Sequence, residues 1–177
     1  MKFRVLGCSG AEFPGHNPPG FLIDEEVLFD AGSLTNVLDS DDQWKIKHIF
    51  ITHAHLDHIR GIPFLADNII IKNKKHSFNL ISIPPVLKTI SKNLLNNSIW
   101  PDFSMLPDHK NPIIKYIEMK EGTAVKFNSY EVTAYYVNHS VPSVGYLIGH
   151  DKRLLFYTGD MGPTQQTWGK IGDRQIN

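Results

Sequence analysis

Three histidines and an aspartate lie within six consecutive residues of the chain, in the order His53, His55, Asp57 and His58. They follow directly after the apolar segment 47–52, which is predicted to form a buried strand. A rigid strand that ends in a short loop can direct several side chains toward one point. Imidazole and carboxylate groups are ligands of zinc, manganese and iron. The pattern therefore predicts a metal site at the end of a β-strand. The alternative is a solvated histidine-rich loop without metal.

The spacing within this motif divides the four side chains into two pairs. His53 and His55 stand two residues apart, so in an extended chain they point to one side and can share a metal ion. Asp57 and His58 are adjacent, and in a turn or the first turn of a helix they can reach a second ion. One short loop cannot complete two coordination spheres, so further ligands are expected from other parts of the chain.

Two more candidate ligands follow predicted strands further along the chain. His139 comes after the strand predicted over 130–137, and Asp160 comes after the strand predicted over 154–158. The other histidines are weaker candidates. Three are expected in solvated positions: His48, His76 and His150. Two lie in long loops that could overhang a site: His16 and His109.

The chain has 177 residues, 41% of them hydrophobic, which suits one domain of roughly 100–200 residues and excludes intrinsic disorder. Strand patterns outnumber helix patterns and indicate α/β layers. Ser33 is predicted to cap a short helix, and residues 96–112 are predicted to form a long irregular loop. Strands are also predicted over 3–6, 21–23, 27–29, 69–72, 80–83, 113–118, 124–127 and 144–148, and helices over 59–65 and 86–95.

Charge and cysteine content bear on partners and location. Eighteen basic and eighteen acidic side chains cancel, and such a balance argues against a nucleic-acid partner. The single Cys8 excludes an internal disulfide and fits a reducing compartment. No signal-peptide pattern and no apolar run of ~20 residues is found, so we expect a cytoplasmic protein without a membrane partner.

Taken together, these motifs resemble the metallo-β-lactamase superfamily of two-metal hydrolases. The segment His53–Ile59 is most similar to its class II cyclic-nucleotide phosphodiesterase-like branch. Segments 6–10, 28–32, 99–103 and 138–146 also look like that branch, so the resemblance covers nearly the whole chain. It implies an αβ/βα sandwich of mixed β-sheets flanked by helices, as a single domain over residues 1–177.

The resemblance also implies a role for each candidate ligand and for two divalent metal ions, with zinc expected first and manganese or iron as alternatives. His53, His55 and His139 would hold the first ion, Asp57 and His58 the second, and Asp160 would bridge them. Asp57 would also act in catalysis, by orienting the nucleophile or taking its proton. Asp30 would brace the metal loop from outside the coordination spheres, although a helix-capping role is an equal alternative. The substrate-binding residues stay unassigned.

One departure from the family concerns the end of the sequence. Members have a final histidine ligand on the second metal, after a further strand and helix. Here no histidine lies in residues 161–177. We expect that the sequence lacks the C-terminal part of the fold. The alternatives are a partner chain that supplies the rest and a site that works with fewer ligands.

The resemblance predicts hydrolysis of a 3′,5′-cyclic nucleotide or a related small phosphodiester. One alternative is ribonuclease Z-like processing of transfer-RNA 3′ ends, which segment 141–146 also resembles. Against it, the Gly-Glu-Gly-Thr-Gln stretch expected near Asp30 is replaced by Ser33-Leu34-Thr35-Asn36, and the chain has no basic arm. The other alternative is a metal-binding or dimerising protein without turnover. A homodimer is expected if strand edges are left open.

Overall fold

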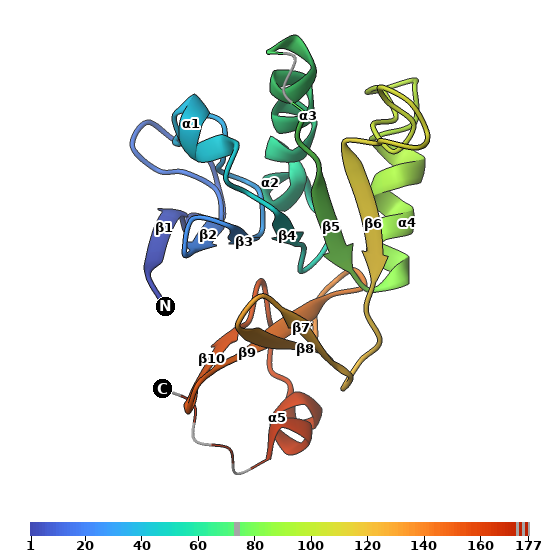
Figure 1. Ribbon diagram of the computed structural model, residues 1–177. Coiled ribbons are helices and arrows are strands. Elements are labelled where there is room, and N and C mark those ends of the chain that lie inside the picture. The colour runs from blue at the N-terminus through green and yellow to red at the C-terminus, as the bar shows by residue number, and fades with distance from the viewer. Residues whose placement is uncertain (73–74, 173, 175, 177) are drawn as a thin grey trace.

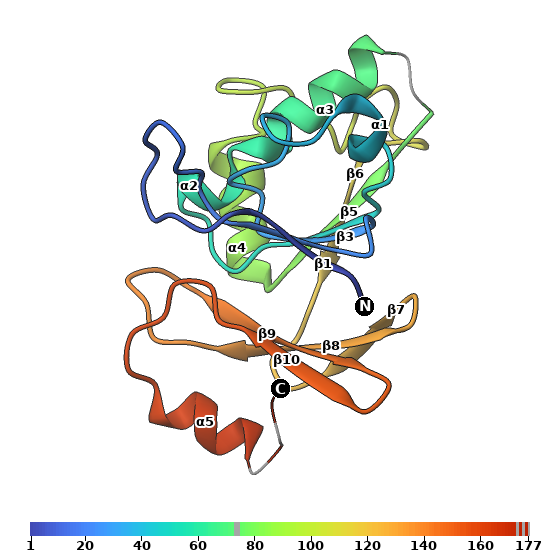
Figure 2. The same cartoon turned by 90° about the vertical axis from the view of Figure 1, so that its left-hand side faces the viewer.

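The computed structural model describes residues 1–72, 75–172, 174 and 176. Two β-sheets lie face to face, and helices cover the outer side of each sheet (Figure 1, Figure 2). The order of layers is therefore helix, sheet, sheet, helix. This architecture is the predicted αβ/βα sandwich of mixed sheets.

The first sheet is mixed and contains six strands in chain order. The first three strands are joined by antiparallel pairing, whereas the third to sixth pair in parallel. Its central parallel strands are apolar on both faces, because helices cover one side and the second sheet covers the other. The strands are β1 (Phe3–Gly7), β2 (Gly20–Ile23), β3 (Val27–Phe29), β4 (His48–Phe50), β5 (Phe78–Ser82) and β6 (Ile114–Glu118).

The second sheet is antiparallel throughout, in the order β10-β9-β8-β7. Aromatic side chains fill the space between the two sheets: the ring of Phe50 lies 5.3 Å from that of Tyr146 and 4.9 Å from that of Phe127. The core thus depends on contacts between segments far apart in sequence. The strands are β7 (Ala124–Phe127), β8 (Tyr130–Tyr136), β9 (Val144–His150) and β10 (Arg153–Tyr157).

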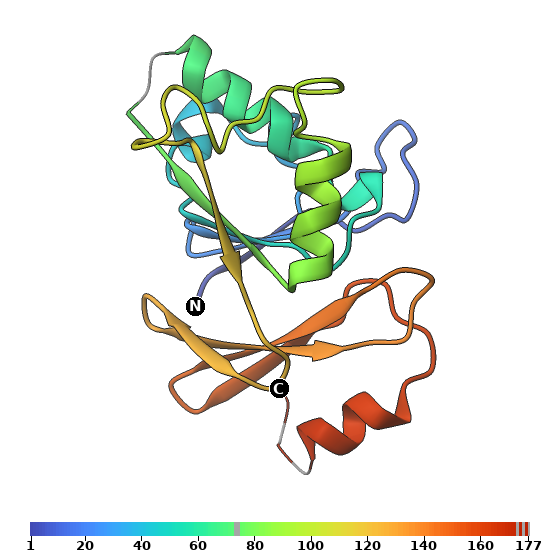
Figure 3. The same ribbon diagram turned by 90° about the vertical axis from the view of Figure 1, so that its right-hand side faces the viewer.

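Four helices lie on the outer side of the first sheet and one on the outer side of the second (Figure 2, Figure 3). Two prolines begin the fourth helix, where their missing N–H groups cost no hydrogen bond. The helices are α1 (Ser40–Gln43), α2 (Leu56–Ile59), α3 (Gly61–Ile71), α4 (Pro84–Asn93) and α5 (Gln165–Ile171). No helix in the described ranges is long and apolar enough to cross a membrane.

Two local predictions are wrong. The strand predicted over 69–72 is the end of α3: Ile69 follows Leu65 by four residues and is buried on the same face of the helix. Residues 32–38 form turns instead of a helix capped by Ser33, and the first helix begins further on, where the Asp39 side chain accepts the N–H of Asp42 at 2.9 Å. Within the segment 161–177, α5 was not predicted, and Asp173, Gln175 and Asn177 lie outside the described residues.

Candidate metal centre

Four segments bring the predicted ligands together at one edge of the sandwich. His53 and His55 follow β4, and His55 is the last extended residue before α2. Asp57 and His58 lie in α2 itself. The remaining two candidates come from the second sheet, with His139 in the loop after β8 and Asp160 in the loop after β10.

Three imidazoles form the first part of the centre. Nε2 of His53 lies 3.0 Å from Nδ1 of His55, and Nε2 of His139 lies 3.3 Å from the same Nδ1. Ligand atoms of all three residues lie within 4.8 Å of one another. Three ring nitrogens that face one point can coordinate one metal ion.

The second part is more acidic and shares one histidine with the first. His53, His58 and Asp160 offer ligand atoms within 4.8 Å of one another. Nε2 of His58 lies 3.5 Å from Oδ1 of Asp160 and 3.6 Å from Oδ2 of Asp57. Asp57 therefore stands beside this group, with a side chain that is 31% exposed. The structure brings all six predicted ligands into one cluster.

A buried carboxylate outside the cluster orients it. Asp30 Oδ2 accepts hydrogen bonds from His58 Nδ1 at 2.7 Å, from the Tyr157 hydroxyl at 2.7 Å and from Thr52 Oγ1 at 2.9 Å. Its Oδ1 also accepts the backbone N–H of Thr52 at 2.8 Å. The side chain thus braces the metal loop, as expected, and caps no helix. This is the arrangement by which an outer carboxylate fixes the tautomer of a histidine ligand.

The hydrogen bonds to Asp30 decide which ring nitrogens face the cluster. Because His58 donates through Nδ1 to Asp30, its Nε2 is the ring nitrogen that faces the cluster, and it offers a lone pair to a metal ion when the ring is neutral. That Nε2 is buried and has no hydrogen-bond partner in the described structure. Thr52 Oγ1 donates to Asp30 and lies 3.0 Å from Nδ1 of His53, so it accepts that N–H and leaves Nε2 of His53 as a lone pair. Lone pairs that meet in a buried place fit a bound cation.

The charges around the two buried histidines fit the same conclusion. Burial, with a smaller effect of the neighbouring His58, lowers the pKa of His53 to about 4, so this imidazole is neutral and free to coordinate. Burial also acts to lower the pKa of His58, but the hydrogen bond and charge of Asp30, with the charges of Asp57 and Asp160, raise it overall. Surroundings that stabilise a protonated histidine stabilise positive charge in general, which a metal ion supplies.

Two glycines allow the segments of the centre to approach closely. A Cβ at Gly32 would overlap the carbonyl oxygen of Asp57, so only glycine lets the chain after Asp30 pass against α2. Gly159 has φ +56°, and a Cβ there would lie 2.7 Å from the side chain of Thr52. Glycine adopts this left-handed conformation without strain. It places the next residue, Asp160, beside His58.

The five remaining histidines lie outside the cluster. Two of them are exposed, as loop positions suggest: His16 and His109. The other three are not simply solvated. His76 contacts the Ile46 carbonyl at 2.8 Å through Nε2, whereas the rings of His48 and His150 pack against Phe127 and Tyr130.

Sequence reasoning missed two residues of the site, Thr52 and Tyr157. Both touch Asp30, and neither carries a metal-binding group. The available signals were positional: Thr52 stands directly before His53 at a strand end, and Tyr157 stands three residues before Asp160. A threonine or tyrosine at such a position is common in any strand, so the pattern alone does not distinguish it.

Comparisons with known proteins agree with this geometry. The sequence profile of the "Beta-lactamase superfamily domain" matches residues 26–175. This match covers most of the chain and includes all six predicted ligands. The chain belongs to the beta-lactamase superfamily, and its fold together with the histidine cluster implies a divalent metal.

One curated relative and two solved structures show which proteins within the superfamily this chain is similar to. The chain is 33% identical over 187 aligned positions to a protein named Ribonuclease Z from Pyrococcus horikoshii, covering 99% of this chain and 58% of that protein. It shares the fold of unliganded yeast PDE1, with a TM-score of 0.79 at 16% identity over 93% of this chain and 66% of that one. It also shares the fold of human tRNase Z, short form, with a TM-score of 0.62 at 21% identity over 94% of this chain and 71% of that one.

These comparisons confirm the predicted superfamily, and the likeness to yeast PDE1 is consistent with the predicted branch at the level of the fold. The chain spans a little over half the length of the Pyrococcus relative.

The prediction of a small-molecule partner, with nucleic acid as an unlikely one, is wrong. The matching relatives are named for cleavage of RNA. The prediction relied on a net charge of zero, but net charge sums over the whole surface. Several acidic side chains here are neutralised locally, as in the pairs Lys47–Glu26 and Arg60–Glu12. Among the described residues, other lysines form no such pair and leave positive charge on part of the surface.

Proposed function

We propose that this chain carries the metal-binding part of a ribonuclease Z-type phosphodiesterase that cleaves RNA at the 3′ end of precursor transfer RNA. One observation carries the proposal: the 33% identity to a Ribonuclease Z extends over 99% of this chain and so includes the whole histidine–aspartate cluster. The likeness to human tRNase Z supports the fold of such an enzyme.

We propose two divalent metal positions within the cluster. The clustered ring nitrogens of His53, His55 and His139 would hold one ion. Asp57 and His58 would hold the other. The carboxylate of Asp160 would be shared, because its ligand atom lies within 4.8 Å of those of His53, which belongs to the first group, and His58, which belongs to the second.

Bound divalent ions would lower the pKa of a water molecule toward neutrality and withdraw charge from the phosphoryl oxygens. The side chains of the chain itself perform the remaining tasks. Asp30 holds the His58 ring through Nδ1 and the His53 ring through Thr52. Asp57 would orient an attacking water and take its proton, because its partly exposed carboxylate lies beside the cluster, 3.6 Å from Nε2 of His58.

The predicted cyclic-nucleotide activity receives less support than this alternative. Its structural support, the likeness to yeast PDE1, concerns the fold at 16% identity. The similarity to Ribonuclease Z proteins is closer and extends along the sequence. Both reactions break a phosphodiester at the same kind of centre, so they differ in what surrounds the metal.

The test compares three substrates with zinc- or manganese-loaded protein: a precursor transfer RNA with a labelled 3′ trailer, 3′,5′-cyclic AMP and bis(p-nitrophenyl) phosphate. We expect release of the trailer and no turnover of cyclic AMP. His139→Ala should reduce trailer release by about 100-fold or more, because it removes a metal ligand. His109→Ala is the matched control, since His109 is exposed and outside the cluster.

Turnover of cyclic AMP with an intact RNA trailer would contradict the proposed substrate. If wild type binds metal but turns over none of the three substrates, the result would support the non-catalytic alternative instead.

A further inference from the structure

A second feature lies at the opposite end of the parallel strands of the six-stranded sheet, away from the metal centre. There, a pocket of about 650 Å³ opens between the end of α3 and the segments 75–77 and 107–113, which lead into β5 and β6. We refer to it as the lysine pocket. Its volume lies within the roughly 300–1,000 Å³ of typical small-ligand sites.

Three lysines from three different segments line this pocket: Lys75, Lys110 and Lys115. All three are exposed, and in the described part of the chain none lies within ion-pair distance of a carboxylate. The neighbouring Asp108 accepts the backbone N–H groups of Lys110 at 2.8 Å and Asn111 at 3.0 Å through its Oδ1, and in the described structure it forms no ion pair with the three lysines. The pocket therefore presents three lysine ammonium groups that no ion pair in the described structure neutralises.

The rest of the lining is suited to an apolar group with polar edges. His76 at the rim is held in place through the Ile46 carbonyl, and Ser77 and Asn111 add a hydroxyl and an amide. The remaining lining residues are apolar: Ile69, Ile70, Pro107, Pro112 and Ile113. A ligand with an anionic group and a flat or apolar body would satisfy both kinds of surface.

We infer that the lysine pocket binds a nucleotide segment of the RNA substrate, with a phosphate among the three lysines and the ribose and base against the apolar lining residues. The inference rests on the proposed function, which supplies a phosphate-rich polymer as substrate. Lysine side chains that contact phosphate contribute affinity without reading sequence.

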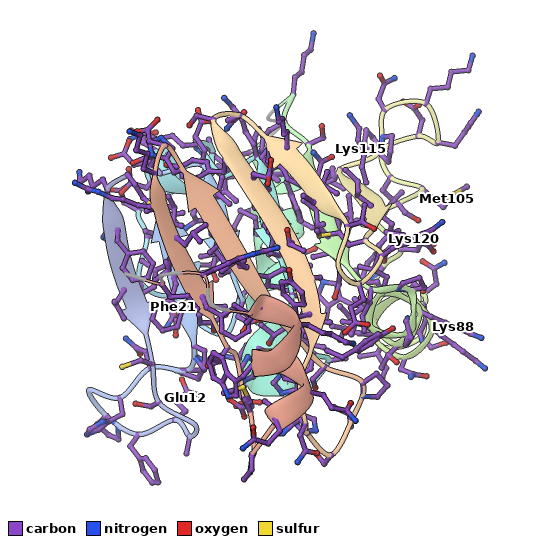
Figure 4. The ribbon with its side chains drawn as sticks, turned by 90° about the horizontal axis from the view of Figure 1, so that it is seen from below. Glu12, Phe21, Lys88, Met105, Lys115 and Lys120 are labelled. Atoms are coloured by element: carbon purple, nitrogen blue, oxygen red, sulfur yellow. The ribbon has the colours of Figure 1, made fainter. Side chains whose placement is uncertain are left out.

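The position of the pocket fits a substrate that extends well beyond the scissile bond. β4 and β5 are parallel, so the metal centre at the end of β4 and the pocket at the start of β5 lie at opposite edges of the sheet. Figure 4 shows Lys115 far from Glu12, which pairs with Arg60 next to α2. Five residues of β5 span ~17 Å, so an RNA that reaches both places must extend over several nucleotides.

The test replaces two pocket lysines, Lys110→Ala with Lys115→Ala, and compares this double variant with a control of the same charge change. The control is Lys88→Ala with Lys120→Ala, two exposed lysines outside the pocket lining that Figure 4 also shows. Binding of labelled precursor transfer RNA is measured by fluorescence anisotropy over a range of salt concentrations. Hydrolysis of bis(p-nitrophenyl) phosphate and the melting temperature report on the metal centre and the fold.

For the pocket variant we expect the Kd for RNA to rise about tenfold. The slope of log Kd against log salt concentration should fall by the contribution of about one to two phosphate contacts. Hydrolysis of the small substrate should be unchanged, because it needs the metal centre alone. Lys110→Arg with Lys115→Arg should restore binding. Equal weakening in the pocket and control variants, or no weakening in either, would overturn the inference.

Two further outcomes separate this inference from the proposed function. A mononucleotide that binds wild type and not the pocket variant, while RNA binds both equally, would overturn the assignment to RNA. Pocket-dependent RNA binding by a wild-type protein that leaves the RNA uncleaved would support the pocket and contradict the proposed function.

Discussion

At the scale of single residues, the centre depends on Asp30. This fully buried carboxylate receives hydrogen bonds from Thr52, His58 and Tyr157, which belong to three different segments. It also has φ 56°, a left-handed conformation that aspartate and asparagine adopt more readily than most residues. Its charge and its backbone conformation can therefore be tested separately.

Asp30→Asn keeps the side-chain shape and the left-handed backbone but removes the negative charge beside His58. We expect zinc affinity to fall by about 10- to 100-fold, as is typical when the carboxylate partner of a histidine ligand is replaced. A chelator competition measures this. Asp151→Asn is the matched control, since Asp151 has the same φ of 56° but is exposed. Unchanged zinc affinity in Asp30→Asn would show that Asp30 has no role in orienting the ligands.

Four of the six ligands were predictable from sequence because they lie within six consecutive residues directly after one strand. His139 and Asp160 were predictable as strand-end residues. The hydrogen bonds of Thr52 and Tyr157 to Asp30 were not, because they depend on how β10 and β4 are placed around the start of the segment after β3. Such side-chain convergence leaves no pattern in the sequence.

At the scale of elements, the contact between α2 and the chain after β3 is closest at Gly32. Gly32→Ala would place a methyl group on the carbonyl of Asp57 and force α2 to shift. We expect a loss of about 1–3 kcal/mol in unfolding free energy, typical of overpacking, together with weaker zinc binding. Gly10→Ala is the control, because a Cβ at Gly10 has open space around it. Thermal melts that coincide for the two variants would contradict this account.

A second contact between elements joins the two sheets. The Tyr130 hydroxyl in β8 donates to the carboxylate of Asp24, in the turn between β2 and β3. This hydrogen bond, with a smaller effect of the Lys2 backbone, lowers the pKa of Asp24 below its usual 3.8. A carboxyl whose pKa is lower in the folded protein stabilises the fold above its ordinary pKa, and that contribution is lost as the pH falls.

Tyr130→Phe removes this donor. We expect a loss of about 1 kcal/mol in unfolding free energy at pH 7, shrinking toward zero as the pH falls through and below 3.8. Urea unfolding at several pH values measures it, with Tyr136→Phe as an exposed control on the same strand. A difference between Tyr130→Phe and wild type that stays constant with pH would contradict the assigned partner.

Most elements were predictable because their apolar patterns are regular, as in β8 and α4. The exceptions have physical reasons. Ile69 and its β-branched neighbours favour a strand locally, but packing of Ile69 with Leu65 on the sheet favours continuation of α3. Helices α1 and α5 span only four and seven residues, so they have little periodicity to detect.

At the scale of the whole molecule, the prediction about nucleic acid was wrong because it used the net charge of the whole chain. Equal numbers of acidic and basic residues argue against a nucleic-acid partner only on the assumption that charge is spread evenly over the surface. In the structure, carboxylates gather with histidines at one edge of the first sheet, while Lys75, Lys110 and Lys115 line a pocket at the other. A sequence gives the sum of charges, whereas the fold determines their separation.

The central claim is that the six clustered side chains bind catalytic divalent metal. The most direct measurement is equilibrium dialysis against zinc, followed by metal analysis of wild type and of the double variant His55→Ala with His139→Ala. The account predicts about two zinc ions per chain in wild type and about one in the variant, whose Asp57, His58 and Asp160 are intact. Wild type that retains no more zinc than the double variant would contradict the claim.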